Sequence, residues 1–164
     1  MTVSETATET QTETETQTET QAAESGSLPA PVEETRAALL EAAESGDYEA
    51  LRPLIPEQFS YTFGGPVEGG PIAFWQQLEQ ESGVSPISVL ADLLELPPVL
   101  HRGTYVWPFA FALEADELTD YERELLRDVG GEDLSDDFLP EGGYLGWRAG
   151  IEPDADWIFF IAGD

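Results

Sequence analysis

The sequence of 164 residues contains no cysteine, no lysine and no asparagine, and it has a single histidine. Without cysteine the chain forms no disulfide, thiolate metal site, iron–sulfur cluster or cysteine nucleophile. A single histidine likewise excludes metal sites that are built on a histidine pair. The lack of cysteine does not decide the compartment.

Positive charge is scarce as well. Six basic residues, all arginine, stand against 34 acidic residues, which gives a net charge of −28 at pH 7. Such a field repels phosphate backbones and anionic lipid headgroups, so we expect no nucleic-acid partner, and any ligand is expected to be neutral, cationic or apolar. Two explanations of the composition stay open: a bacterial or archaeal protein adapted to a high-salt cytoplasm, or a codon bias that favours arginine over lysine.

Long apolar runs are missing. The longest one, from Tyr105 to Leu113, is interrupted by Pro108 and falls far short of the roughly 18 to 20 apolar residues that a membrane-spanning helix needs. Met1 is not followed by the basic and then apolar segments of a secretory signal. We therefore expect no membrane insertion and a cytoplasmic location, with an extracytoplasmic one as the alternative if an anchor precedes Met1.

The N-terminal segment has the composition of a disordered tail. From Thr8 to Gln21 threonine alternates with glutamate or glutamine, so neither face of a strand built from this segment would be apolar. Because the segment has no apolar side chains to bury, no hydrophobic burial would offset the conformational entropy that it loses on ordering. We predict a disordered acidic tail over residues 1–27, either a plain tail or a stalk, and a single domain over residues 28–164.

The domain combines helical and strand patterns. Prolines, glycines and capping residues separate its apolar segments, and Thr119 with Glu122 forms a capping-box pattern. We predict helices near residues 31–45, 48–55, 71–82, 86–95 and 118–129, and strands at 58–63, 103–107 (continuing irregularly to 111), 144–151 and 157–162. The expected fold is α+β, with helices packed on one face of a curved, mainly antiparallel, cone-like sheet.

The residues from Ala37 to Leu78 carry a family resemblance. They include A-E-S-G-D-Y between two helices, F-S-Y-T-F-G-G, and then G-G-P-I-A-F-W-Q-Q-L, while the chain closes on D-A-D-W-I-F-F-I. This arrangement resembles the nuclear transport factor 2-like superfamily, which includes SnoaL-like polyketide cyclases and ketosteroid isomerases. The resemblance implies a cone with a pocket between helices and sheet. It covers about half the chain; residues 82–142 depart from it, which leaves the register of the middle strands open.

Aromatic side chains are the candidates for such a pocket, because each combines a large apolar surface with, in tyrosine and tryptophan, one hydrogen-bond donor. An interior filled by the tryptophans would instead exclude the pocket. The candidate pocket residues are Tyr61, Trp75, His101, Tyr105, Trp107 and Trp147.

Catalytic signals are weak. His101 would need an orienting carboxylate to act as a base, and a carboxylate acid or base would need burial that raises its pKa. Glu68, Asp92 and Glu95 are the carboxylates with apolar neighbours in the sequence. We name no catalytic residue with assurance and expect no cofactor.

Metal and phosphate motifs are also absent. The aspartates at 133, 136, 137, 154 and 156 lack EF-hand spacing, and the glycine-rich stretch at 64–70 lacks P-loop spacing. We expect no metal site.

The strand predicted at 144–151 suggests a contact surface. Tyr144, Gly146, Arg148 and Gly150 share one face, and its two glycines leave room for another element or subunit. We expect Arg148 to pair with a carboxylate.

Three functions remain open. The leading hypothesis is non-catalytic binding of a small apolar or neutral ligand, or pairing of two chains through the sheet as a homodimer. The alternatives are a small isomerase, cyclase or dehydratase with a buried carboxylate, and a stalked extracytoplasmic interaction domain.

Overall fold

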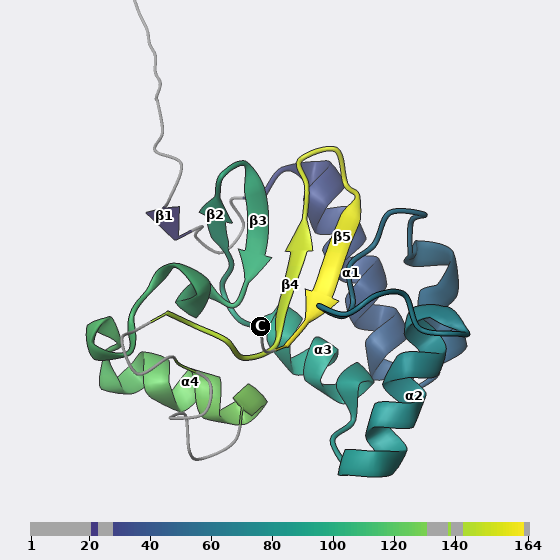
Figure 1. Cartoon of the computed structure of the whole chain (residues 1–164). Helices are drawn as coiled ribbons and strands as arrows, with labels where there is room; N and C mark the ends of the chain where they lie inside the picture. The colour runs from purple at the N-terminus through teal and green to yellow at the C-terminus, as the bar shows by residue number, and fades with distance from the viewer. Residues whose placement is uncertain (1–20, 23–27, 131–137, 139–142, 163–164) are drawn as a thin grey trace, which may run out of the picture.

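A computed structural model of the chain describes residues 21–22, 28–130, 138 and 143–162. It confirms the α+β class: helices gather on one side of an antiparallel sheet, and the helix Asp120–Gly130 (α4) contacts the helix Pro86–Glu95 (α3) (Figure 1). Most of the predicted tail, residues 1–20 and 23–27, lies outside the described residues. The elements are β1 Gln21–Ala22, α1 Ala30–Glu44, η1 Tyr48–Leu54, α2 Gly70–Ser82, α3 Pro86–Glu95, β2 Val99–His101, β3 Thr104–Trp107, η2 Phe109–Ala112, η3 Ala115–Glu117, α4 Asp120–Gly130, β4 Arg148–Ile151 and β5 Trp157–Ile161.

The first two helices follow the predicted pattern. Helix α1 begins with proline in its first turn and buries Val32, Leu39, Ala42 and Ala43 on one face. The carboxylate of Asp47 then accepts a hydrogen bond from the backbone N–H of Glu49 at 3.0 Å, which caps η1. The second helix is therefore confirmed in place, although it is a 3-10 helix.

The predicted strand at 58–63 is wrong. Only Ser60 pairs with β5, as an isolated parallel bridge in which its N–H donates to the Ile158 carbonyl and its carbonyl accepts from Phe160, both at 3.0 Å. Beyond Ser60 the Tyr61 hydroxyl accepts a hydrogen bond from the backbone N–H of Val67 at 2.8 Å, so the chain curls into a loop. Aromatic residues do alternate along this segment, but only Ser60 pairs with β5.

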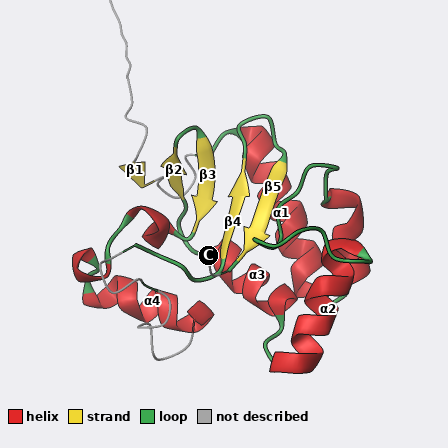
Figure 2. Cartoon of the chain, viewed as in Figure 1, coloured by secondary structure: helices red, strands yellow, loops and turns green. Residues whose placement is uncertain are grey.

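The sheet has the order β1-β2-β3-β4-β5, with every neighbouring pair antiparallel (Figure 2). The terminal hairpin β4–β5 was predicted, whereas β2 was not. A two-residue turn joins β2 to β3, and both of its residues, Arg102 (φ 51°) and Gly103 (φ 89°), adopt the left-handed conformation. Such turns match the right-handed twist of the strands they connect.

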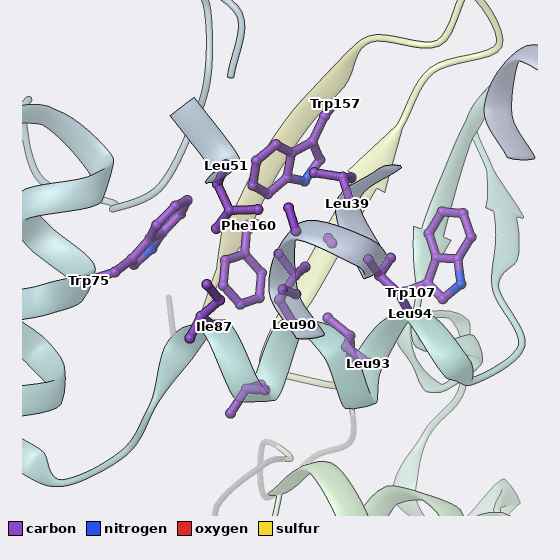
Figure 3. Packing of buried hydrophobic residues seen from close by; sticks show 14 of the residues in the cluster. Leu39, Leu51, Trp75, Ile87, Leu90, Leu93, Leu94, Trp107, Trp157 and Phe160 are labelled. Atoms are coloured by element: carbon purple, nitrogen blue, oxygen red, sulfur yellow. The ribbon is translucent and has the colours of Figure 1, made fainter. Parts of the chain in front are cut away.

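The main core lies between the helices and the sheet and is filled by aromatic rings (Figure 3). Trp75 and Trp107 are 0 % exposed, and Trp157 is 1 % exposed. The ring centroids of Trp75 and Phe160 lie 5.4 Å apart, and those of Trp75 and Trp157 lie 6.0 Å apart. The space in which the family resemblance implied a pocket is therefore occupied by the side chains of the protein itself.

Helix α4 packs in a second apolar cluster. The predicted capping box is present: Thr119 N–H donates to Glu122 Oε2 at 2.8 Å, and Glu122 N–H donates to Thr119 Oγ1 at 3.2 Å. The helical spacing of the apolar residues in this segment predicts that Leu118, Tyr121, Leu125 and Val129 face inward. In the structure Leu126 is the most buried described residue of the helix, at 1 % exposed, whereas Tyr121 is 71 % exposed. The buried face of α4 therefore includes Leu126 and excludes Tyr121.

The face of the sheet on which Gly150 lies has no open space over this glycine. Val106 and Ile161 on this face are buried. A side chain at Gly150 would meet the ring of Phe159, and one at Gly146 would meet the ring of Tyr144. Rings of the same chain occupy the room that these glycines leave, which corresponds to the first of the two predicted alternatives, another element or a subunit.

Candidate functional site

An open groove of about 650 Å³ lies where the loop after Ser60 passes the C-terminal half of α2. We call it the aromatic groove. Its main apolar side chains are Tyr61, Phe63, Phe74, Leu78, Val84 and Trp147.

Two of these side chains are unusually exposed for their type. Phe63 is 56 % exposed and Val84 is 42 % exposed, and in the described part of the chain Tyr121 is the only other large apolar residue in that class. Single exposed apolar residues are ordinary on protein surfaces, whereas apolar residues gathered at one hollow mark a binding surface. The exposure of Phe63 and Val84 in one hollow is the feature that distinguishes this groove.

Contacts with the core fix the position of the rings. Trp147 stacks on Phe160, which is fully buried, with ring centroids 4.8 Å apart and an interplanar angle of 29°. Tyr61 packs against Phe74 at 5.6 Å. Because these rings are already packed in the absence of a ligand, binding would cost little additional conformational entropy.

Arg148 lies against Phe63. Its guanidinium carbon is 5.5 Å from the centroid of the Phe63 ring, and its Nη1 donates to the carbonyl of Gly146 at 3.2 Å. The residue is 9 % exposed, and it is the only buried charged residue in the described ranges. Arg148 thus holds the exposed ring of Phe63 in place through a cation–π contact.

No acidic or basic side chain lines the aromatic groove within the described residues. A smaller hollow of about 190 Å³ adjoins it and shares Phe74 and Leu78 with it. The carboxylate of Glu81 lines this smaller hollow and accepts a hydrogen bond from Gln77 Nε2 at 3.0 Å. A charged side chain therefore lies beside the groove but does not line it.

The structure brings two of the six predicted pocket residues together, namely Tyr61 and Trp147. Trp75 and Trp107 lie in the main core, and Tyr105 is half-buried against it. His101, at the end of β2, packs its ring against another aromatic ring 5.1 Å away. Phe63 was predicted on the strand at 58–63, as part of the core or of a pocket lining, whereas Phe74 and Val84 were not predicted as site residues. The position of Val84 directly after Gly83, which ends α2, could have indicated an exposed residue.

The candidate carboxylates do not fit the catalytic pattern. Glu68, Asp92 and Glu95 are all exposed, and no described aspartate or glutamate is buried. The pKa values of the Glu33 and Glu49 carboxyl groups are both lowered, chiefly by hydrogen bonds from Arg36 and Arg52. These shifts are opposite to the direction that a general acid requires.

Histidine and aspartate add no further catalytic or metal site. Within the described ranges no carboxylate lies within ion-pair distance of His101. Asp154 and Asp156 lie exposed in the β4–β5 turn, whereas residues 133, 136 and 137 lie outside the described residues. Searching only the described part of the chain reveals no cluster of three potential metal ligands.

A second hollow, of about 370 Å³, lies between η2 and the start of α4. Phe109, Leu113 and Leu125 line it together with Tyr121, whose side chain is exposed. It carries one of the three exposed large apolar side chains, whereas the aromatic groove carries two.

Comparison with known proteins gave no match to a protein-family model, to a curated protein or to a solved structure. The resemblance to the nuclear transport factor 2-like superfamily therefore stays a prediction. None of the helices in the described ranges has the length and apolar character that would let it cross a membrane.

Proposed function

We propose that the domain binds a small molecule with an apolar body in the aromatic groove, without catalysing a reaction on it. The observation that carries this proposal is the exposure of Phe63 and Val84 beside Tyr61 and Trp147 in one hollow. The volume of about 650 Å³ is of the size that holds a small ligand, since binding pockets commonly measure about 300–1,000 Å³.

The hydrophobic effect supplies the driving force. Each Å² of apolar surface that a ligand covers contributes roughly 25 cal/mol, and the groove presents the exposed ring of Phe63 together with apolar surface of Tyr61 and Trp147. The hydroxyl groups of Thr62 and Ser82 also line the groove and can orient a polar substituent. Such a site favours molecules with one apolar body and few polar atoms.

The other hypotheses have less support. A carboxylate-based isomerase would need a buried acid, and the described carboxylates are not buried. Pairing through the sheet would need a free edge or an open face. In the described structure the edge strands of the sheet are β1, which has only two residues, and β5, which is bridged by Ser60, and aromatic rings cover Gly146 and Gly150.

The test uses Nile red, an uncharged apolar dye whose fluorescence rises in apolar surroundings. We expect saturable binding whose dissociation constant rises about tenfold in Phe63→Ala, because the exposed ring is removed. Tyr121→Ala is the matched control, since it removes another exposed aromatic ring, which lines the second hollow.

Three results would overturn the proposal: no saturable binding, binding that Phe63→Ala leaves unchanged, or binding that is lost only in Tyr121→Ala. The last result would place the site beside α4. Because Phe63 is 56 % exposed, its replacement should leave the fold intact, which the thermal unfolding curve verifies.

A further inference from the structure

We propose that the ligand of the aromatic groove is a small organic cation, such as a quaternary ammonium compound, and not a neutral molecule. This inference rests on the proposed function, because it assigns a chemical class to the ligand of the same site. Three observations carry it: the aromatic character of the groove, the absence of basic residues from its lining, and the charge of the chain.

Aromatic rings dominate the lining. Tyr61, Phe63, Phe74 and Trp147 contribute four rings to one hollow. The face of an aromatic ring carries partial negative charge, so it attracts an organic cation within about 6 Å of its centroid. Trp147 stacks on Phe160 with one face, is half-buried, and lines the groove. Rings gathered in this way recognise alkylated ammonium groups better than they recognise neutral groups of equal size.

Phe63 already makes such a contact within the protein. The guanidinium of Arg148 lies 5.5 Å from the centroid of its ring. Arg148 is 9 % exposed and does not line the groove, so a ligand there contacts the Phe63 ring and not the guanidinium. The exposed part of the Phe63 ring remains available for a second group.

The surrounding charge favours a cation over any anion. The chain has a net charge of −28, and neither the aromatic groove nor the adjoining hollow has a lysine, arginine or histidine among its described lining residues. Glu81 lines the adjoining hollow, which shares Phe74 and Leu78 with the aromatic groove. A cation therefore gains from ring contact and from the negative field together, whereas a neutral ligand gains only from apolar contact.

The experiment compares choline with dimethylbutanol, its uncharged carbon isostere, so that shape is held constant and charge varies. Nitrogen–proton correlation NMR follows the indole N–H signals of the four tryptophans, which are assigned through Trp147→Phe and its counterparts. Trp75, Trp107 and Trp157 are buried in the core, so ligand in the groove should shift the Trp147 signal selectively. Each titration is matched with potassium chloride at equal ionic strength to remove the general salt effect.

We expect choline to bind with a dissociation constant about tenfold lower than that of dimethylbutanol. Phe63→Leu keeps an apolar side chain but removes the ring, so it should weaken choline binding by about three- to tenfold and change dimethylbutanol binding less than about twofold. Glu81→Gln removes one negative charge beside the groove and should weaken choline binding by a smaller factor, about twofold.

The outcomes separate this inference from the proposed function. If both probes shift Trp147 with equal affinity, or if Phe63→Leu affects them equally, the groove binds apolar molecules and the cation inference is wrong. If choline shifts all four indole signals as potassium chloride does, its binding is non-specific and the inference is also wrong. If neither probe nor Nile red perturbs the groove, the proposed function fails as well.

Discussion

Gly150 offers the sharpest test of how this sheet is packed, because the ring of Phe159 lies directly over it. An alanine β-carbon at position 150 would lie 2.3 Å from Cε1, 2.6 Å from Cζ and 2.9 Å from Cδ1 of Phe159. Ordinary carbon contacts are about 3.5–4.0 Å, so the overlap exceeds about 1 Å. The substitution Gly150→Ala therefore forces the ring out of its present position.

The expected loss follows from the burial at this point. Gly150 is buried and Phe159 is half-buried, so the ring can move only by giving up its cross-strand packing over the glycine. Overpacking of this kind lowers the free energy of unfolding by about 1–3 kcal/mol. In a chain of 164 residues this corresponds to a fall in melting temperature of roughly 2–10 °C.

Urea unfolding measures the effect, with the fluorescence of the buried tryptophans as the signal. The matched control is Gly65→Ala, because a β-carbon there meets no atom within 4 Å and the backbone needs no positive φ. We expect the control to stay within about 0.5 kcal/mol of the original chain.

A double-mutant cycle completes the test. In a Phe159→Ala background the obstructing ring is gone, so Gly150→Ala should become neutral or slightly stabilising. Equal stability of Gly150→Ala and Gly65→Ala would refute the reasoning. A loss that persists unchanged in the Phe159→Ala background would show that something other than the ring opposes a side chain at position 150.

Three further predictions concern hydrogen bonds and charge. Tyr48→Phe removes the hydroxyl that donates to Glu79 and should lower the free energy of unfolding by about 1–2 kcal/mol. Burial, and then the bond to Glu79, raise the pKa of Tyr48 from 10.0 to about 12, so this stabilisation is full below pH 10 and is lost as the pH rises toward 12; urea unfolding across that window should show a smaller loss in the variant. Arg36→Ala should lower stability by about 1 kcal/mol because Arg36 also donates to the Leu94 carbonyl at 2.8 Å, whereas Arg52→Ala, which breaks an exposed Arg–Glu pair of the same spacing, should cause no measurable loss. The melting temperature should rise as potassium chloride is increased from millimolar to molar, because salt screens the repulsion of a net charge of −28; an unchanged value would also argue against the high-salt explanation of the composition.

The helices were predictable because each carries its own local signals. Proline in the first turn begins α1, α2 and α3, and the Thr119–Glu122 capping box precedes α4. These signals act over three or four residues and do not depend on distant parts of the chain. The face of α4 was less predictable, because which apolar residues are buried depends on the neighbouring elements that cover them.

The strands were harder to predict because pairing depends on residues far apart in the sequence. The short strand β2 pairs through a turn of Arg102 and Gly103, and no strong turn pair such as Asn-Gly marks it. The β4–β5 hairpin was recognisable because β5 is continuously apolar and aromatic, apolar residues recur along the segment of β4, and a Pro-Asp turn separates the two strands.

The candidate site was missed for a reason that links it to the failed strand. As a regular strand, residues 58–63 would place Phe59, Tyr61 and Phe63 on one face and bury all three in the core. In the structure Phe59 and Tyr61 are half-buried against the core, with the ring of Phe59 4.5 Å from that of Trp157, but pairing with β5 ends at Ser60. The chain then turns away, and Phe63 is left 56 % exposed. The aromatic groove therefore exists because the loop interrupts the strand, and a substitution that extended the pairing to Phe63 would remove the exposed ring on which the proposed binding depends.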